Sequence, residues 1–368
     1  MTWTSENFDE AVQAVAAWDI FGASPLRVPE HRSDFESFAT RLQATRLIGP
    51  LLAAAEVGDI ELAAELEADL ITRHEAALLW CIELEVRLLE AREWFDADGE
   101  IEFRVIKGPA IAYLDALNPS MRTFADIDLL IRSSDIDRAV LILEQRGAAR
   151  PWSQRRPNWD RRFAKSVTMT FGDGIQFDLH RMLVDGVFGH RIPLERLFTS
   201  ADAFEIGGVT FQTLGAVHRL LHSASHLLLG SSVPALMNLR DLAGYLGDDR
   251  LTPNLVVFEA QQWRGETVLA LALDQVTKRV ATIPPIWAEW RSSFEPDQRD
   301  VNLIRRHRSE GSNFGRAKLD VLVELPALRD VAAYATALAW PSRQHLESRG
   351  LRRRDSLRPL LSLGTGGR

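Results

Sequence analysis

Two aspartates that stand two residues apart are the sharpest chemical feature of this sequence. They lie in the run Arg122-Thr-Phe-Ala-Asp126-Ile-Asp128-Leu-Leu-Ile, whose second half is typical of a β-strand. Because side chains at i and i+2 of a strand point the same way, Asp126 and Asp128 would share one face. Two such carboxylates repel each other unless they share a cation, and Mg²⁺ prefers carboxylate oxygens together with substrate phosphates. The alternative is a solvated strand face or a polar start to the strand.

A short turn upstream could hold the anionic partner of such a cation. Val105-Ile106-Lys107-Gly108-Pro109 reads as a strand, a turn and the start of a helix. Gly108 would let the backbone approach a ligand closely, and the N–H groups that open a helix favour anions. Lys107 could meet a phosphate, although it could equally be an ordinary surface lysine. The chain has only four lysines, Lys107, Lys165, Lys278 and Lys318, so each of them is conspicuous.

A third carboxylate follows in the run Gln176-Phe-Asp178-Leu-His180, which alternates polar and apolar residues. Asp178 and His180 would share the polar face of a strand. Asp178 could complete a metal site or act as a general base. The alternatives are a polar edge-strand residue for Asp178 and a hydrogen-bonded structural histidine for His180.

The elements that must position these residues fall into three regions. Residues 1–100 read as helical, with Leu62, Leu66 and Leu70 on one helix and the stripe Leu78, Ile82, Val86 and Leu89 on the next. Residues 101–212 read as a mixed α/β unit, with hairpins at 164–180 and 203–211. Residues 213–368 read as helical again, including a helix over 319–339, and end in a basic tail. The sequence therefore predicts an α+β fold in which a small mixed sheet is embedded between N- and C-terminal helical regions.

Composition excludes several classes of protein. The chain has 368 residues, of which 46% are hydrophobic, and a formal charge of −8, as expected for a globular protein. A single cysteine, Cys81, excludes an internal disulfide and a multi-cysteine metal site. We find no secretory signal and no apolar run of membrane-spanning length, which predicts a cytoplasmic protein. The charge is uneven, at −14 over residues 1–100, +1 over 101–340 and +5 over 341–368.

Together these motifs resemble the polymerase-β-type nucleotidyltransferase superfamily. More narrowly, they are similar to an uncharacterised bacterial nucleotidyltransferase-like family with the pattern K-G, then R-x-x-x-D-I-D-L-L, then D-L-H. The resemblance implies that Asp126 and Asp128 bind two Mg²⁺ ions, or Mn²⁺, with a nucleoside triphosphate. It also implies that Asp178 holds one ion and activates the attacking hydroxyl. Lys107, Gly108, Arg122 and His180 would then belong to the nucleotide site, although Arg122 could instead form an ion pair with Asp126.

Two further groups of residues leave alternatives open. His222, His226 and Asp241 have a spacing that could bind zinc, but a hydrogen-bond network between helices explains them better. Several groups of arginines, interleaved with Trp152 and Trp159, could contact RNA or could simply be solvated. They lie at 155–156, 161–162, 305–306, 308 and 352–354.

The sequence thus predicts an enzyme that moves a nucleoside monophosphate from an NTP to a hydroxyl acceptor and releases pyrophosphate. The negative net charge favours a small-molecule acceptor over tRNA or protein. The rival hypothesis from another class is an inert binding module that retains the fold. Retention of all three carboxylates argues against that rival, because their mutual repulsion is costly without a cation.

Overall fold

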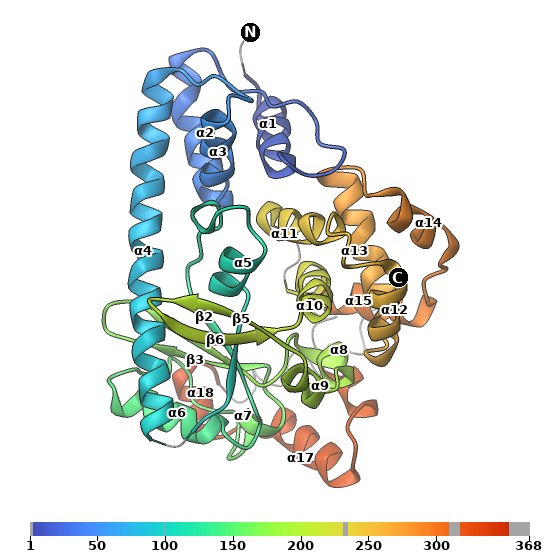
Figure 1. The fold of residues 1–368 in the computed structure, drawn as a ribbon. Coiled ribbons are helices and arrows are strands. Elements are labelled where there is room, and N and C mark those ends of the chain that lie inside the picture. The colour runs from blue at the N-terminus through green and yellow to red at the C-terminus, as the bar shows by residue number, and fades with distance from the viewer. Residues whose placement is uncertain (1–2, 99, 231–234, 309–316, 353–368) are drawn as a thin grey trace.

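The computed structural model describes residues 3–98, 100–230, 235–308 and 317–352 (Figure 1). Four helices form the N-terminal region, and the last of them extends along one side of the molecule. Their bounds are α1 Ser5–Ala17, α2 Arg32–Thr45, α3 Ile48–Glu56 and α4 Ala64–Ala97.

A four-stranded sheet with the order β1-β2-β4-β3 follows α4. β2 is antiparallel to β1 and parallel to β4, and β3 is antiparallel to β4, so the sheet is mixed. The strands and the short helices among them are β1 Phe103–Ile106, α5 Gly108–Leu114, η1 Pro119–Met121, β2 Ile127–Ile131, α6 Ile136–Gln145, α7 Trp159–Arg162, β3 Ser166–Thr170 and β4 Gln176–His180. The alternating sequence around Asp128 and the hairpin at 164–180 are confirmed as strands of this sheet.

A two-stranded hairpin and a helical region complete the chain. The two-stranded antiparallel sheet of β5 and β6 confirms the second predicted hairpin and lies close to α4 in Figure 1. The elements after β4 are α8 Gly186–Arg191, α9 Leu194–Thr199, β5 Ala201–Ile206, β6 Val209–Leu214, α10 Ala216–Leu229, α11 Leu236–Leu246, α12 Pro253–Gln262, α13 Glu266–Arg279, α14 Pro285–Ser293, α15 Gln298–Arg308, η2 Val321–Val323, α17 Leu328–Ala339 and α18 Arg343–Ser348. The α+β class, with a small mixed sheet among helices, is as the sequence predicts.

Two hydrophobic cores lie on the two faces of the four-stranded sheet. Ile127, Leu129 and Leu179 point into a core shared with α4 and α6. Ile106 and Leu130 point to the opposite side, into a larger core built by α1–α3 and by the helices after β6. The aspartates of β2 and β4 alternate with the first set, so they face the helical side.

Two sequence-based predictions for the helices are wrong. Leu66 and Leu70 of the first stripe and the whole stripe at 78–89 belong to one continuous helix, α4, and not to two, while Leu62 lies just before it. Within it, Ile82 and Val86 are exposed, while Cys81, Leu84 and Leu88 are buried because the sheet packs against the neighbouring face. The predicted helix over residues 319–339 is interrupted between η2 and α17, at a segment that contains Pro326.

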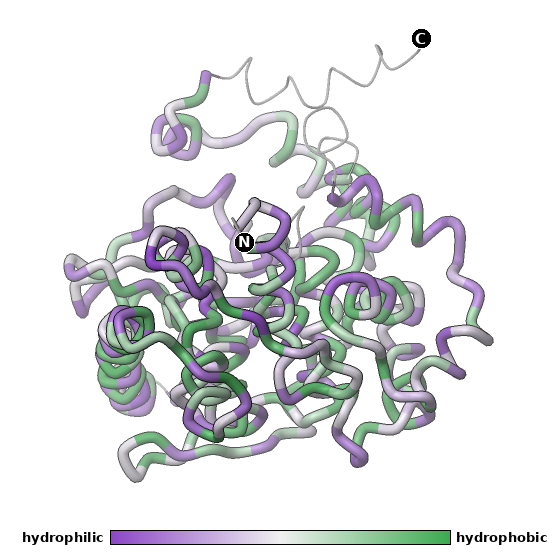
Figure 2. Tube along the Cα trace, turned by 90° about the horizontal axis from the view of Figure 1, so that it is seen from above, coloured by the Kyte–Doolittle hydropathy of each residue, from purple (hydrophilic) through white to green (hydrophobic). Residues whose placement is uncertain are grey.

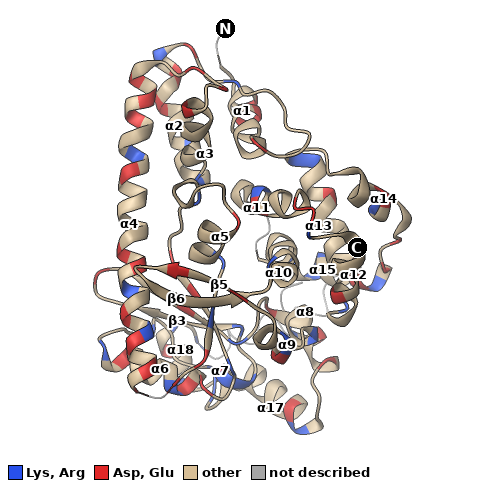
Figure 3. Cartoon of the chain, viewed as in Figure 1, with Lys and Arg blue, Asp and Glu red and all other residues tan. Residues whose placement is uncertain are grey.

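Charged residues are spread over the outer helices (Figure 3). Hydrophilic and hydrophobic residues likewise alternate along the tube in Figure 2. No helix in the described part of the chain is both long enough and apolar enough to cross a membrane.

Candidate active site

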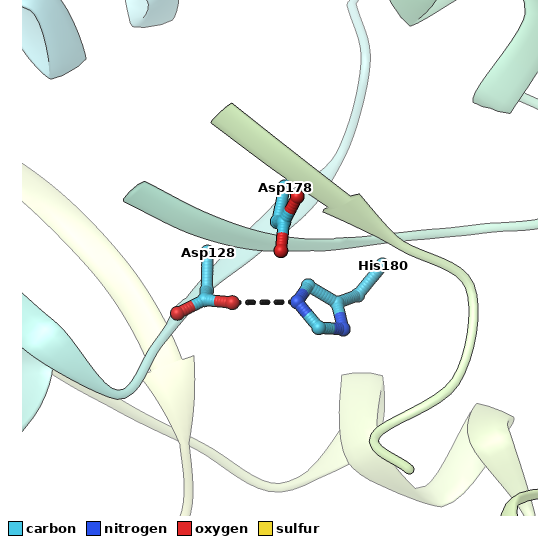
Figure 4. A group of neighbouring side chains, drawn as sticks. All are labelled: Asp128, Asp178 and His180. Atoms are coloured by element: carbon cyan, nitrogen blue, oxygen red, sulfur yellow. Dashed lines mark hydrogen bonds and ion pairs between the residues drawn. The ribbon is translucent and has the colours of Figure 1, made fainter. Parts of the chain in front are cut away.

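Parallel pairing of β2 with β4 brings two of the predicted carboxylates side by side. In the register of this pair, Asp128 lies opposite Asp178, and Leu130 lies opposite His180. Asp128, Asp178 and His180 each offer a ligand atom, and these atoms all lie within 4.8 Å of one another. Figure 4 shows the three side chains converging on the same face of the sheet. Residues that are 50 positions apart in sequence therefore meet because their strands are neighbours.

Asp128 is the centre of a buried charge network. Its side chain is only 3% exposed, and its Oδ1 lies 2.7 Å from Lys107 Nζ and 2.6 Å from His180 Nε2. Burial alone would raise the pKa of Asp128, but the charge and hydrogen bonds of Lys107 and His180 outweigh it and hold the pKa well below its usual value. Burial lowers the pKa of His180 itself. The carboxylate is thus kept ionised inside the fold.

Asp126 sits immediately before β2, next to this network. Burial raises the pKa of Asp126, and the negative charge of Asp128 raises it further, while Lys107 and Arg46 act in the opposite direction. A carboxylate that is costly to ionise beside another carboxylate is the situation that a bound cation relieves. Asp126 is not among the three residues whose ligand atoms converge most closely.

Asp178 is held by its neighbour on β3. Thr168 lies opposite Asp178 in the antiparallel pair, and its Oγ1 donates a hydrogen bond of 2.5 Å to Asp178 Oδ1. This bond leaves the other carboxylate oxygen of Asp178 for a ligand. The β3 strand was predicted, but this contact depends on the register of the hairpin.

The Lys107–Gly108 turn is strained and tightly packed. Lys107 has φ 59° and ψ −139°, a backbone conformation that residues other than glycine rarely adopt. Such strain persists only where the surroundings maintain it, and it is concentrated at functional sites. A Cβ on Gly108 would approach Phe124 Cβ to 3.3 Å, so close packing accounts for the glycine.

Lys165 is a site residue that sequence reasoning missed. It precedes β3, and its carbonyl accepts hydrogen bonds from the backbone N–H groups of Arg181 and Met182, just beyond β4. Burial lowers its pKa, the charge of Lys107 lowers it further, and Asp128 and Asp178 oppose this effect. Among the described residues, its ammonium group has no hydrogen bond or ion pair. The scarcity of lysines was the signal that could have found it.

Arg122 forms a buried ion pair that the sequence motifs did not predict. Its guanidinium binds Asp241 of α11, with both Nε–Oδ1 and Nη2–Oδ2 distances of 2.9 Å, and Nη1 donates to the carbonyl of Thr123. Both side chains of the ion pair are 7% exposed. The alternative that Arg122 pairs with Asp126 is therefore wrong, because its carboxylate partner is Asp241. The ion pair instead ties the approach to β2 to the C-terminal helices.

The same ion pair engages Asp241, the acidic member of the predicted His222–His226–Asp241 cluster, and all three residues line one cavity. Asp241 is occupied by Arg122, whereas His226 Nδ1 lies 3.2 Å from Asn238 Nδ2. The rings of His222 and His226 meet edge to face, with centroids 6.1 Å apart. The hydrogen bond between α10 and α11 is thus present, but it involves Asn238 in place of Asp241.

Several of the arginines that could contact RNA bind other residues of the protein instead. Arg155 and Arg156 donate to carbonyls at the end of α17 and just beyond it, and Arg162 pairs with Asp330. Trp159 stacks on Tyr334 with centroids 5.2 Å apart. These residues attach the C-terminal helices to the segment before β3. Residues 353 and 354 lie outside the described part of the chain.

The donor set fits a hard divalent cation. Carboxylate oxygens of Asp128 and Asp178 dominate it, with Asp126 beside them, and such oxygens suit Mg²⁺ or Mn²⁺ better than soft metals. An unpaired lysine next to the carboxylates suits an anion bound together with the cation.

One comparison with known proteins identifies the family of this chain. A model of a family described as uncharacterised nucleotidyltransferases matches residues 31–280. A crystal structure of an antigenic nucleotidyltransferase-like protein from Paracoccidioides brasiliensis is similar at 13% identity and a TM-score of 0.31, over 57% of this chain and 96% of that one. None of the curated proteins matches. Since the family model spans most of the chain, including all three aspartates, the protein belongs to this family of uncharacterised nucleotidyltransferases.

Proposed function

We propose that the protein transfers a nucleoside monophosphate from an NTP, with ATP the first candidate, to a hydroxyl group and releases pyrophosphate. The observation that carries the proposal is the pairing of Asp128 with Asp178 on adjacent parallel strands, with Asp126 two residues before Asp128. Two carboxylates on one face of a sheet and a third immediately before one of its strands can hold the cations that a triphosphate requires. Asp126, Asp128 and Asp178 would hold two Mg²⁺ ions, or Mn²⁺. When bound, such ions supply positive charge to the attacking and leaving oxygens of an in-line phosphoryl displacement.

Two lysines would bind the phosphate chain. Lys107 now balances Asp128 at 2.7 Å, and it can turn to a phosphate oxygen when other positive charge reaches that carboxylate. Lys165 needs no such exchange because its ammonium group makes no hydrogen bond or ion pair with the described residues. We leave Arg122 out of the groups that bind the phosphate chain, because its guanidinium is already bound to Asp241 and to a carbonyl.

Asp178 is the candidate general base. Its Oδ1 is oriented by Thr168, and the hydroxyl of an acceptor within hydrogen-bond reach could pass its proton to the other oxygen. His180 would keep Asp128 in place through its 2.6 Å contact rather than touch the nucleotide.

The acceptor is proposed to be a small molecule. A polynucleotide acceptor would need free cations along a groove, but Arg155, Arg156 and Arg162 are bonded to the C-terminal helices. This use of the arginines, together with the net charge of −8, favours a small molecule over tRNA.

Transfer of label tests the proposal. The protein is incubated with Mg²⁺, each α-³²P-labelled NTP in turn and a small-molecule fraction, an RNA fraction or a protein fraction of a cell extract. We expect one NTP to label the small-molecule fraction and Asp128→Asn to abolish labelling. Asp137→Asn, which changes an exposed aspartate of α6, is the matched control and should label normally. Labelling of RNA or protein would overturn the acceptor class, and labelling by Asp128→Asn would overturn the mechanism.

A further inference from the structure

A small, partly open cavity lies behind the Lys107 turn, between the sheet and helices α10 and α11. It is lined by Lys107, by Thr213 at the end of β6, by His222 and His226 of α10, and by Asn238 of α11. The volume open to water-sized molecules is about 30 Å³. That is room for about two water molecules or for the hydroxyl groups of a larger ligand, and far too little for a nucleobase.

Two polar atoms of the lining residues have no partner. His222 Nε2 and Thr213 Oγ1 make no hydrogen bond with any described residue. His222 is 3% exposed and Thr213 is fully buried, so bulk water does not satisfy them. A buried polar atom without a hydrogen bond costs about 1–3 kcal/mol, so the pair calls for a ligand.

The chemistry of the unpartnered atoms is neutral. The charged groups that line the cavity already have partners. Lys107 contacts Asp128, and His226 lies beside Asn238. Arg122 pairs with Asp241, and Arg219 pairs with Asp115 and Asp202. Burial, with the nearby charge of Lys107, lowers the pKa of His222 well below its usual value, so the ring stays neutral at pH 7. A neutral imidazole and a hydroxyl together can both donate and accept hydrogen bonds, which suits an alcohol and not a phosphate.

We propose that this cavity binds a ribose hydroxyl of the nucleotide, with His222 and Thr213 as its hydrogen-bonding partners. An acceptor alcohol has the same chemistry. The nucleotide is favoured because Lys107, the proposed phosphate partner, lines the cavity, whereas Asp178, the proposed base for the acceptor, does not. The inference rests on the proposed function and adds the group by which the nucleotide sugar is recognised.

The test compares nucleotides that lack one hydroxyl. Binding of the Mg²⁺ complexes of α,β-methylene-ATP and of its 2′-deoxy and 3′-deoxy forms is measured by calorimetry. The proteins are wild type, Thr213→Val, which conserves volume, His222→Leu and His222→Gln. Ser225→Ala, a buried change on α10 away from the cavity lining, is the control. Thermal unfolding establishes that each variant is folded, and Thr213→Val carries the test if His222→Leu is not.

We expect wild type and Ser225→Ala to bind one deoxy form about tenfold more weakly than the parent nucleotide, the size of one hydrogen bond. Thr213→Val and His222→Leu should bind the parent about tenfold more weakly and no longer discriminate, and His222→Gln should recover part of the loss. An unchanged ratio of parent to deoxy affinity in both variants would overturn the inference and leave the cavity to water. Variants with normal nucleotide affinity but slower transfer would overturn it in favour of the acceptor. Failure of the wild type to bind any of the Mg²⁺–nucleotide complexes would instead overturn the proposed function.

Discussion

Removal of Arg122 is a perturbation that separates a structural role from a nucleotide-binding role. Arg122→Met leaves Asp241 as a carboxylate that is 7% exposed and has lost a two-pronged partner. Breaking one side of a buried ion pair costs about 3–5 kcal/mol, because the remaining charge is uncompensated. Asp241→Leu should cost a similar amount, since it leaves the guanidinium buried without its anion. The double variant Arg122→Met/Asp241→Leu removes both charges and should recover most of the loss, to within about 1–2 kcal/mol of wild type.

The assay has two readouts. Urea unfolding, followed by far-ultraviolet circular dichroism and tryptophan fluorescence, gives the free energy of unfolding for the four proteins of the cycle and their coupling energy. Calorimetry with Mg²⁺ and inorganic triphosphate measures phosphate binding without any contribution from a sugar or base. We expect strong coupling in stability and a triphosphate affinity in the double variant that is within about twofold of wild type.

Either of two results would refute this reasoning. If the two single losses simply add in the double variant, the ion pair does not hold the strand-side segment to α11 as the structure indicates. If the double variant is stably folded but binds triphosphate at least tenfold more weakly, Arg122 reaches the phosphates, as the sequence motif suggested.

Three further predictions follow from the charges of the site. Lys165→Met should weaken binding of Mg²⁺–triphosphate tenfold or more, about the value of a charge-assisted hydrogen bond. The control Lys278→Met, at an exposed position on α13, should leave the affinity unchanged. Equal affinities of the two variants in calorimetry would exclude Lys165 from the phosphate site. Asp126→Asn should raise the free energy of unfolding by about 1 kcal/mol, because burial and the charge of Asp128 make that carboxylate costly to ionise. The same variant should abolish NMP transfer. A lower free energy of unfolding in urea would contradict the prediction. The pKa of His226 is lowered to about 3, chiefly by burial, so the unfolded chain, with a pKa near 6.5, takes up the proton first and stability falls as pH drops below about 6.5. Between pH 7 and pH 5 this one histidine should cost about 2 kcal/mol, and the pH dependence of urea unfolding should be shallower by that amount in His226→Gln; identical slopes in the two proteins would show that His226 does not carry the effect.

Sequence reasoning succeeded wherever the information was local. The period of two around Asp128 and Asp178 predicted two strands and which of their side chains share a face, and the glycine turns predicted both hairpins. The K-G, R-x-x-x-D-I-D and D-L-H patterns pointed to the family whose model matches residues 31–280. These features repeat over a few residues, so no knowledge of distant neighbours was required.

Prediction from the sequence was wrong where the partner of a side chain is distant along the chain. Arg122 lies four residues from Asp126 yet binds Asp241, 119 residues away, because burial requires the partner that the packed helices present. The prediction of the buried face of α4 was wrong for a similar reason. Ile82 is as apolar as Leu84, and only the position of the sheet decides which of the two side chains is buried.

What the sequence determined by itself is the alternation that places carboxylates on one side of each strand. What only the tertiary structure decided is that β2 and β4 are parallel neighbours in the register that sets Asp128 beside Asp178. The docking of α10 and α11 against the Lys107 turn, which leaves His222 and Thr213 beside a small cavity, was likewise decided by the fold. The physical reason is the range of the interactions: strand periodicity follows from backbone geometry within a few residues, whereas strand order, buried ion pairs and cavities arise from packing between segments that the chain brings together from far apart.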